Sequence, residues 1–265
     1  MATSLTQILK AKRERLVNLV NRSPEELREE ALEARKYALP HLLRKAIAPQ
    51  DRLNVIAEIK RASPWQDVDQ AEISPAELAL AYSKGGAAAI SVWTEEDYFH
   101  GSVDDLRAVR VAMSLPLLQK DFIIEPSQVY ETAIVGVDAL LLIGAILDEE
   151  RLSLLRKIAE DELGLDALVE VQNSNEMLWA YSLGATLIGV NNRNSYTHEV
   201  SLDVSVEVAR AAPKDILLVS ENGLRTGKQI HGLRALGYSG FLIGEALMRG
   251  NNPDKTLKEL LRSKG

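Results

Sequence analysis

Lysine and glutamate side chains recur at the ends of short apolar runs in this sequence of 265 residues. Glu58 and Lys60 close the first run two residues apart, so on a strand they would share one face. A carboxylate beside lysines in a pocket partly closed to water can act as a base, and a lysine of lowered pKa can act as an acid. Five runs end in the polar groups Glu58, Lys60, Lys120, Glu170, Asn191, Asn192 and Glu221. We interpret them as candidates for proton transfer in one cavity; strand-end ion pairs that only neutralise each other are the structural alternative.

Several other kinds of chemistry are disfavoured by the sequence. It contains no cysteine, which excludes thiol catalysis and thiolate metal sites, and it lacks the HExxH, GxSxG and Walker patterns. The four histidines do not cluster, so we expect no metal site. A net charge of −7 disfavours nucleic acid and anionic membranes as partners, and no apolar run reaches the ~20 residues of a membrane span. Nothing resembles a signal peptide, and we expect a cytoplasmic monomer.

The positions of these polar groups require a barrel of parallel strands. Eight runs are almost continuously apolar, as strands buried on both faces should be, and amphipathic segments such as 75–86, 127–136 and 226–237 separate them. The runs are 54–59, 88–92, 116–122, 138–143, 166–171, 186–190, 215–220 and 240–244. The alternation predicts an α/β fold, a (β/α)8 TIM barrel with its active site at the carboxyl ends of the strands. An open doubly wound sheet is the alternative, but the first strand lacks a glycine-rich phosphate turn.

Residues 1–48 precede the first strand and read as two or three charged amphipathic helices. We expect this N-terminal helical extension to cover the bottom of the barrel or to fold over its mouth. The barrel itself takes up 49–265, and no linker divides the chain, so 1–265 is predicted to be a single domain. Glycines that follow helical patterns are predicted to end helices in the left-handed conformation: Gly85, Gly136, Gly164, Gly184 and Gly237.

The ends of the last two strands suggest a phosphate site. Asn222-Gly223 follows the seventh strand, and Gly244-Glu245 follows the eighth. Glycines that lead towards helix N-termini at this place form the phosphate cradle common in such barrels. Together with Lys60 they predict a local positive site for a phosphorylated substrate in a protein whose net charge is negative.

The motifs that carry these residues resemble those of the indole-3-glycerol phosphate synthase family. They occur in the family's order and at matching spacing over the whole chain. The motifs are IAEIKRASP (56–64), SVWTEEDYFHGS (91–102), KDFIIEPSQ (120–128), LLLI (140–143), ALVEV (167–171), GVNNRN (189–194), VSENGL (219–224) and LIGEALM (242–248).

The resemblance implies a carbon–carbon lyase of tryptophan biosynthesis that needs no cofactor. It would close the ring of, and decarboxylate, 1-(2-carboxyphenylamino)-1-deoxyribulose 5-phosphate. Lys120 would be the general acid and Glu170 the general base; Lys60 would aid protonation, Glu58 and Asn191 would orient groups, and Glu221 would line the site. The substrate-binding residues would be Ser63, Trp65, Trp93, Phe99, Phe122, Leu142, Arg193, Ser195, Asn222, Gly223, Gly244 and Glu245.

Departures from the family pattern concentrate at strand ends and in the loops beyond them. They are Trp65, Trp93, Gln119, Gln172, Asn194, Ser195, His198 and Asn222. Trp65 and Trp93 are expected to be pocket walls that could stack on a flat aromatic ligand. Three hypotheses therefore stay open: the synthase activity; an engineered or diverged barrel with a Kemp-type carboxylate base or a retro-aldol lysine; and a non-catalytic binding role.

Overall fold

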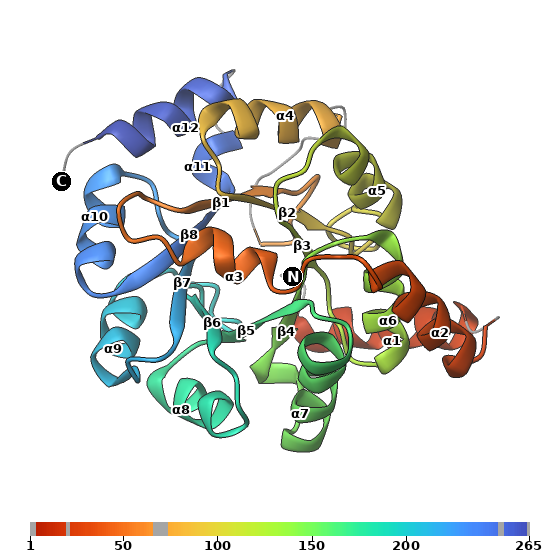
Figure 1. Cartoon of the computed structure of the whole chain (residues 1–265). Coiled ribbons are helices and arrows are strands. Elements are labelled where there is room, and N and C mark those ends of the chain that lie inside the picture. The colour runs from red at the N-terminus through yellow and green to blue at the C-terminus, as the bar shows by residue number, and fades with distance from the viewer. Residues whose placement is uncertain (1–3, 20–21, 66–73, 249–251, 264–265) are drawn as a thin grey trace.

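The strands of the computed structural model, which describes residues 4–19, 22–65, 74–248 and 252–263, follow one another around a closed parallel barrel. β8 pairs with β1 and closes the ring (Figure 1). The strands are β1 (Val55–Ile59), β2 (Ala89–Trp93), β3 (Leu117–Lys120), β4 (Ala139–Ile143), β5 (Asp166–Val171), β6 (Leu187–Asn191), β7 (Leu217–Glu221) and β8 (Tyr238–Ile243). The (β/α)8 barrel predicted from the sequence is confirmed.

Helices form the outer layer, and α12 packs against α4 so that the ring of helices also closes (Figure 1). The helices after β1 are α4 (Pro75–Gly85), α5 (Val103–Ala112), α6 (Pro126–Val135), α7 (Glu149–Lys157), α8 (Ser174–Ser182), α9 (Asp203–Ala211), α10 (Gly227–Ala235), α11 (Glu245–Met248) and α12 (Pro253–Arg262). Two short turns, η1 (Gly144–Ile146) and η2 (Ile158–Glu162), flank α7.

Two apolar layers explain why the strands are apolar on both faces. Val55, Ala57 and Ile59 of β1 pack outward against the helices, whereas Ile56 lies in the separate cluster that fills the barrel. Successive side chains of a strand point to opposite faces, so each strand contributes to both layers. Every side chain of β1 is buried as a result.

Most strand boundaries differ from the predicted runs by one or two residues, and two differences from the prediction have a clear packing reason. β8 begins at Tyr238 instead of Gly240, because the buried Tyr238 ring packs in the outer layer and its hydroxyl donates to the Ser205 carbonyl at 2.8 Å. The left-handed residue after α4 is Gly86, with φ of 98°, and Gly85 is the last helical residue. Gly85 is tightly packed instead, because a Cβ there would lie 3.0 Å from Leu257.

The N-terminal extension covers both ends of the barrel. It consists of α1 (Leu5–Leu19), α2 (Pro24–Arg35) and α3 (Leu42–Ile47). α3 crosses the centre of the ring in Figure 1 and places Leu43 and Ile47 in the inner cluster, whereas α2 packs beside α6. α1 reaches the opposite end, where Leu5 and Ile8 join the same cluster as Trp93. The two alternatives considered for this segment are therefore both realised, by different helices.

Arginines tie the extension to the bottom of the barrel. The Arg44 backbone N–H donates to Asp166 Oδ2 at 2.9 Å, and its guanidinium lies 3.3 Å from Asp166 Oδ1 and 2.9 Å from Glu160 Oε1. Arg156 faces the other oxygen of Glu160 at 2.5 Å. Asp138, just before β4, is paired in the same way with Arg110 at 2.9 Å. We call this set of pairs (Arg44, Asp138, Asp166, Glu160, Arg110 and Arg156) the floor clasp.

Candidate active site

A cavity enclosing about 670 Å³ opens at the carboxyl ends of the strands. Its lining comes from six strands, the loops after them and α1. The lining residues are Leu5, Glu58, Lys60, Ser63, Trp65, Trp93, Phe99, Lys120, Phe122, Ile143, Glu170, Asn191, Arg193, Ser195, His198 and Asn222. Of the polar groups predicted to converge, five line this cavity: Glu58, Lys60, Lys120, Glu170 and Asn191. Glu221 does not line it but lies 2.7 Å from Lys120, and the Asn192 side chain donates to Ser220 Oγ outside the cavity.

The two lysines are paired with two different carboxylates. Lys120 Nζ lies 2.7 Å from Glu221 Oε2 and 3.8 Å from Glu58 Oε1, whereas Lys60 Nζ lies 3.1 Å from Glu58 Oε2. All four side chains are buried. Lys120 therefore has Glu221, and not Glu170, as its direct partner.

Two glycines make room for these carboxylates. A Cβ at Gly189 of β6 would lie 2.1 Å from Glu221 Oε1, and a Cβ at Gly244 would lie 2.4 Å from Glu58 Oε2. Glu221 Oε1 has no hydrogen-bond partner among the described residues. The carboxylates are consequently held in a space shaped by the backbone, with one oxygen left unsatisfied.

The surplus of carboxylates over lysines shifts the pKa values of the site. Burial and the nearby Glu221 raise the pKa of Glu170 to about 7. Burial opposes the charge of Lys120, but Glu221, Glu58 and Glu170 outweigh it and raise the pKa of that ammonium. Burial likewise opposes the charge of Glu58, whereas Lys60 and Lys120 lower its pKa. Lys120 is therefore not a lysine of lowered pKa, and it stays protonated at neutral pH.

A chain of side-chain amides orients Glu170. Asn222 Nδ2 donates to Asn191 Oδ1 at 2.8 Å, and Asn191 Nδ2 donates to Glu170 Oε1 at 3.0 Å. The Arg193 backbone N–H also donates to Asn191 Oδ1, at 2.9 Å. With its oxygen occupied by two donors, Asn191 can present only its NH₂ group to Glu170.

Aromatic rings form one wall of the cavity. Trp93 stacks on Phe99 with ring centroids 3.8 Å apart and an interplanar angle of 4°, and Phe122 lies 5.9 Å from Trp93. Trp65 stacks on His198 at 5.5 Å and meets Phe99 edge-on. His198, one of the departures from the family pattern, lines the mouth and has a left-handed backbone conformation with φ of 61°.

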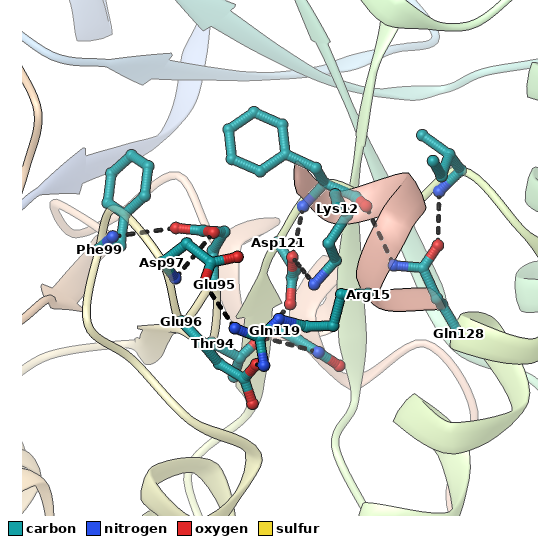
Figure 2. A network of polar contacts seen from close by, with 12 residues as sticks. Lys12, Arg15, Thr94, Glu95, Glu96, Asp97, Phe99, Gln119, Asp121 and Gln128 are labelled. Carbon is teal, nitrogen blue, oxygen red and sulfur yellow. Dashed lines mark hydrogen bonds and ion pairs between the residues drawn. The ribbon is translucent and has the colours of Figure 1, made fainter. Parts of the chain in front are cut away.

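A polar network beneath α1 holds the loops that carry these rings (Figure 2). Lys12 of α1 is buried and lies 2.6 Å from Asp121, the residue after Lys120. Asp121 also accepts the Thr94 hydroxyl at 2.7 Å and the Phe122 backbone N–H at 2.7 Å. α1 is thereby attached directly to the segment that bears the proposed acid.

Glu95 supports the same wall from the loop after β2. Its carboxylate accepts the backbone N–H groups of Asp97 and Phe99 at 3.0 and 2.9 Å (Figure 2). It also accepts the Tyr98 N–H at 2.9 Å. Arg15 of α1 reaches the same loop, 2.5 Å from Asp97. These contacts fix the turn from which Phe99 points onto Trp93.

A smaller hollow of about 290 Å³ adjoins the cavity at the predicted phosphate residues. Asn222, Gly223, Gly244 and Glu245 line it, together with Glu58. Asn222 and Gly223 have φ of 63° and 81°, the left-handed region that glycine and asparagine tolerate best. Glu245 Oε1 lies 3.2 Å from Arg225. The hollow is therefore bordered by the turns after β7 and β8, as predicted.

A further predicted pocket residue, Leu142, does not line the cavity, and two pocket residues were missed. Leu142 points outward into the layer between strands and helices, so it does not wall the cavity. Its neighbour Ile143 does so instead, paired in register with Glu170. Leu5 of α1 also lines the cavity. In an unbroken apolar run no alternation tells which leucine or isoleucine faces inward, and only the neighbouring strand's register decides it.

Neither a metal centre nor a membrane span is found in the part of the chain that the structure describes. No group of three or more histidines, aspartates or glutamates is arranged to hold a metal ion there. No helix within the described ranges is long and apolar enough to cross a membrane.

These features define a class, a (β/α)8 barrel with buried lysine and glutamate side chains gathered at its mouth. The sequence model of the indole-3-glycerol phosphate synthase family matches residues 5–260. An indole-3-glycerol phosphate synthase of Carboxydothermus hydrogenoformans is 44% identical over 262 residues, covering 97% of this chain and 99% of its own. One of Polaromonas naphthalenivorans is 40% identical over 262 residues, covering 98% and 99%. The chain belongs to the indole-3-glycerol phosphate synthase family.

Solved structures with more distant sequences share the fold. Thiamine phosphate pyrophosphorylase from Pyrococcus furiosus matches with a TM-score of 0.60 and 17% identity, over 80% of this chain and 95% of its own. N-acetylmannosamine-6-phosphate 2-epimerase from Clostridium perfringens matches with a TM-score of 0.58 and 16% identity, over 76% and 90%. At this identity the likeness concerns the barrel alone.

Proposed function

We propose that the protein is an indole-3-glycerol phosphate synthase, a carboxy-lyase that acts on 1-(2-carboxyphenylamino)-1-deoxyribulose 5-phosphate. The observation that carries this proposal is the meeting of Lys120, Lys60, Glu58, Glu170 and Asn191 in one cavity of a family member. Ring closure and decarboxylation need a proton donor, a proton acceptor and a binding site for an aryl group and a phosphate.

Lys120 is the acid in this proposal. Bond formation between the aryl ring and the ribulose carbonyl carbon places negative charge on the carbonyl oxygen, which a buried ammonium can protonate. Lys120 holds that proton because Glu221, 2.7 Å away, Glu58 and Glu170 raise its pKa. Lys60, paired with Glu58, supplies a second positive charge to the same cavity.

Glu170 is the base in this proposal. Loss of carbon dioxide restores the aryl ring, and the new ring becomes aromatic when the former carbonyl oxygen leaves as water and a proton is removed. A carboxyl group with a pKa of about 7 is poised to accept that proton near neutral pH. Asn191 leaves one Glu170 oxygen occupied and the other available to substrate.

The remaining assignments concern the parts of the substrate that do not react. The aryl group would lie against Trp93, Phe99 and Phe122, and the phosphate would lie in the hollow beside Gly223 and Gly244. We further propose that the chain works as a single-domain monomer in the cytoplasm and requires no cofactor.

A redesigned pocket with Kemp-type or retro-aldol activity is not favoured by the comparisons. The two tryptophans that suggested it are packed against protein side chains, Trp93 on Phe99 and Trp65 on His198. The residues proposed for the synthase reaction are all present beside them.

Turnover of 1-(2-carboxyphenylamino)-1-deoxyribulose 5-phosphate, followed by the fluorescence of the indole product, tests the proposal. Lys120→Met and Glu170→Gln should each lower kcat by ~10²–10⁴-fold. The double variant should lose much less than the product of the two losses, because both groups serve one reaction. Lys36→Met, exposed at the end of α2, is the matched control and should keep full activity.

A benzisoxazole substrate for the Kemp reaction and a β-hydroxyketone for the retro-aldol reaction provide the comparison arm. Turnover of either without turnover of the synthase substrate would overturn the proposed function, whereas full synthase activity in both single variants would overturn the roles proposed for Lys120 and Glu170.

A further inference from the structure

The indole of Trp93 contacts the catalytic charges as well as forming a wall. Its Nε1–H donates to Glu58 Oε1 at 2.9 Å, and both groups are buried. Lys120 Nζ lies 5.4 Å from the centroid of the same ring. Trp93 and Lys120 are register partners on β2 and β3, and Glu58 lies on β1, in register with Ser91 of β2. The ring therefore contacts both Lys120 and the second carboxylate near it, Glu58.

The orientation of this ring is fixed from outside the cavity. Phe99 stacks face to face on Trp93, and the Glu95 carboxylate fixes the turn that carries Phe99. Phe122 bounds the indole on a further side. A ring held in this way directs its single N–H at one place, and that place is Glu58 Oε1.

The hydrogen bond decides how the carboxylates are shared between the lysines. Glu58 gives Oε2 to Lys60 at 3.1 Å, and Gly244 leaves room for that oxygen. Its Oε1 faces the indole N–H at 2.9 Å and is only 3.8 Å from Lys120 Nζ. Without the indole donor, Glu58 Oε1 would be an acceptor with no hydrogen bond 3.8 Å from the Lys120 ammonium, which would then bridge Glu58 and Glu221.

We propose that Trp93 is a positioning residue that acts through Glu58: its N–H holds the Glu58 carboxylate and thereby keeps the Lys120 ammonium on Glu221. This inference rests on the proposed function, because the Lys120 proton is taken to be the one delivered in the synthase reaction. A residue that served only as an aromatic wall would do its work without an N–H group. That difference is what an experiment can measure.

Trp93→Phe removes the N–H and keeps a ring against Phe99. Kcat for the synthase substrate should fall roughly tenfold, within the range of a lost charge-assisted hydrogen bond, while KM stays within about twofold because the wall remains. In a Glu58→Met background the same substitution should change the residual kcat by less than about twofold, because the acceptor is gone. Trp179→Phe on α8, outside the cavity, is the matched control and should leave kcat unchanged.

The contact can also be observed without turnover. The chain has three tryptophans, so the ¹⁵N–¹H spectrum of the protein should contain three indole N–H signals, of which Trp93→Phe identifies one. That signal should lie downfield and exchange slowly in the unmodified protein, and should move upfield in Glu58→Met. If Trp93→Phe does not fold, Trp65→Phe and Trp179→Phe identify the signal by elimination and this measurement carries the test.

Three results would overturn the proposal. They are an unchanged kcat in Trp93→Phe, an equal loss of kcat on Trp93→Phe with Glu58 present and with Glu58→Met, and a Trp93 indole N–H signal that does not shift in Glu58→Met. Failure of the proposed function gives a different result. The unmodified protein would then show no synthase turnover, whereas the Trp93 signal would still respond to Glu58.

Discussion

The two ends of the barrel use the same ionisable residues in opposite ways. In the floor clasp each carboxylate faces an arginine, and Asp166 and Asp138 also accept backbone N–H groups. At the mouth, Glu58, Glu170 and Glu221 share Lys60 and Lys120, and one oxygen of Glu221 has no hydrogen-bond partner within the described ranges. Paired and satisfied charges cost little to bury, whereas surplus charges cost several kcal/mol and shift their pKa values.

The difference shows that ion pairs stabilise the fold at the floor, whereas the charges at the mouth lower stability and serve the reaction. The floor clasp joins α3 to the N-terminal ends of the strands with complementary pairs. The mouth retains an uncompensated carboxylate, and burial beside Glu221 is what brings the pKa of Glu170 to about 7. An acid–base site at neutral pH depends on this imbalance.

Glu170→Gln should have the largest effect at the mouth: it should remove the catalytic base and, at the same time, raise the free energy of unfolding. Because the folded pKa of about 7 lies above the ordinary value of a glutamate, this carboxyl favours folding below about pH 4.5 and loses that advantage as the pH rises through 7. The amide avoids the loss, so unfolding at pH 8 should require about 2–3 kcal/mol more than in the unmodified protein. Urea unfolding at pH 5 and pH 8 should show a gain that shrinks towards pH 5; a constant gain would contradict the mechanism.

The same titration should appear in the activity of the unmodified protein. The base is active when ionised, so kcat/KM should rise with pH through about 7 and level off above it. A rise centred near pH 4.5 would mean that Glu170 is not the group that titrates.

Asp166→Ala should weaken the floor clasp and lower the stability of the protein without changing its catalytic rate. It leaves the Arg44 N–H without its acceptor and the guanidinium with only Glu160 and the Thr186 hydroxyl, so the free energy of unfolding should fall by about 3 kcal/mol. Kcat of the folded fraction should be unchanged at 20 °C. Asp104→Ala, which removes an exposed pair with Arg107, is the control and should cost less than about 0.5 kcal/mol.

Lys12→Met should have a smaller effect, which should appear both in the stability of the protein and in kcat/KM. Asp121 would keep the Thr94 and Phe122 donors but lose the ammonium 2.6 Å away, so α1 should loosen over the mouth. We expect about 1–2 kcal/mol less stability and a roughly fivefold lower kcat/KM. Lys10→Met, in the exposed pair with Glu14, is the matched control. Lost stability at full kcat/KM would show that α1 is only structural.

Asn222→Gly should produce the smallest change and should separate acid–base chemistry from phosphate binding. Glycine tolerates φ of 63°, so the turn beside the hollow should survive, whereas Asn191 loses a donor. Kcat should fall about threefold, and inhibition by inorganic phosphate should change by less than about twofold. Weaker phosphate inhibition at unchanged kcat would assign Asn222 to the anion and not to Asn191.

The sequence predicted the barrel because eight apolar runs and the glycines between them are local signals. It also predicted Lys120 and Glu170, since a charge at the end of an apolar strand stands out. The prediction that Leu142 walls the cavity was wrong, because β4 is apolar throughout and shows no alternation that would tell inward from outward side chains. The pair of Lys120 with Glu221 joins strands β3 and β7, so it depends on how far side chains reach across the interior, which no spacing along the chain encodes.

The place of α1 was also beyond the sequence. An amphipathic pattern shows that a helix buries one face, but not what covers it. Only the folded chain shows that Lys12 meets Asp121 at the mouth, whereas Arg44, from the same extension, meets Asp166 at the opposite end.

The attachment of α3 to late parts of the chain has a consequence for synthesis on the ribosome. Ile47 packs where Gly240 of β8 allows close approach, and about 200 residues separate the two. At ~5–20 residues per second, the apolar face of α3 emerges ~10–40 s before its last partner exists. A chaperone that binds nascent chains would therefore meet the apolar face of α3 while it is still uncovered. The chaperone has to release α3 before β8 can pack against it and complete the floor of the barrel.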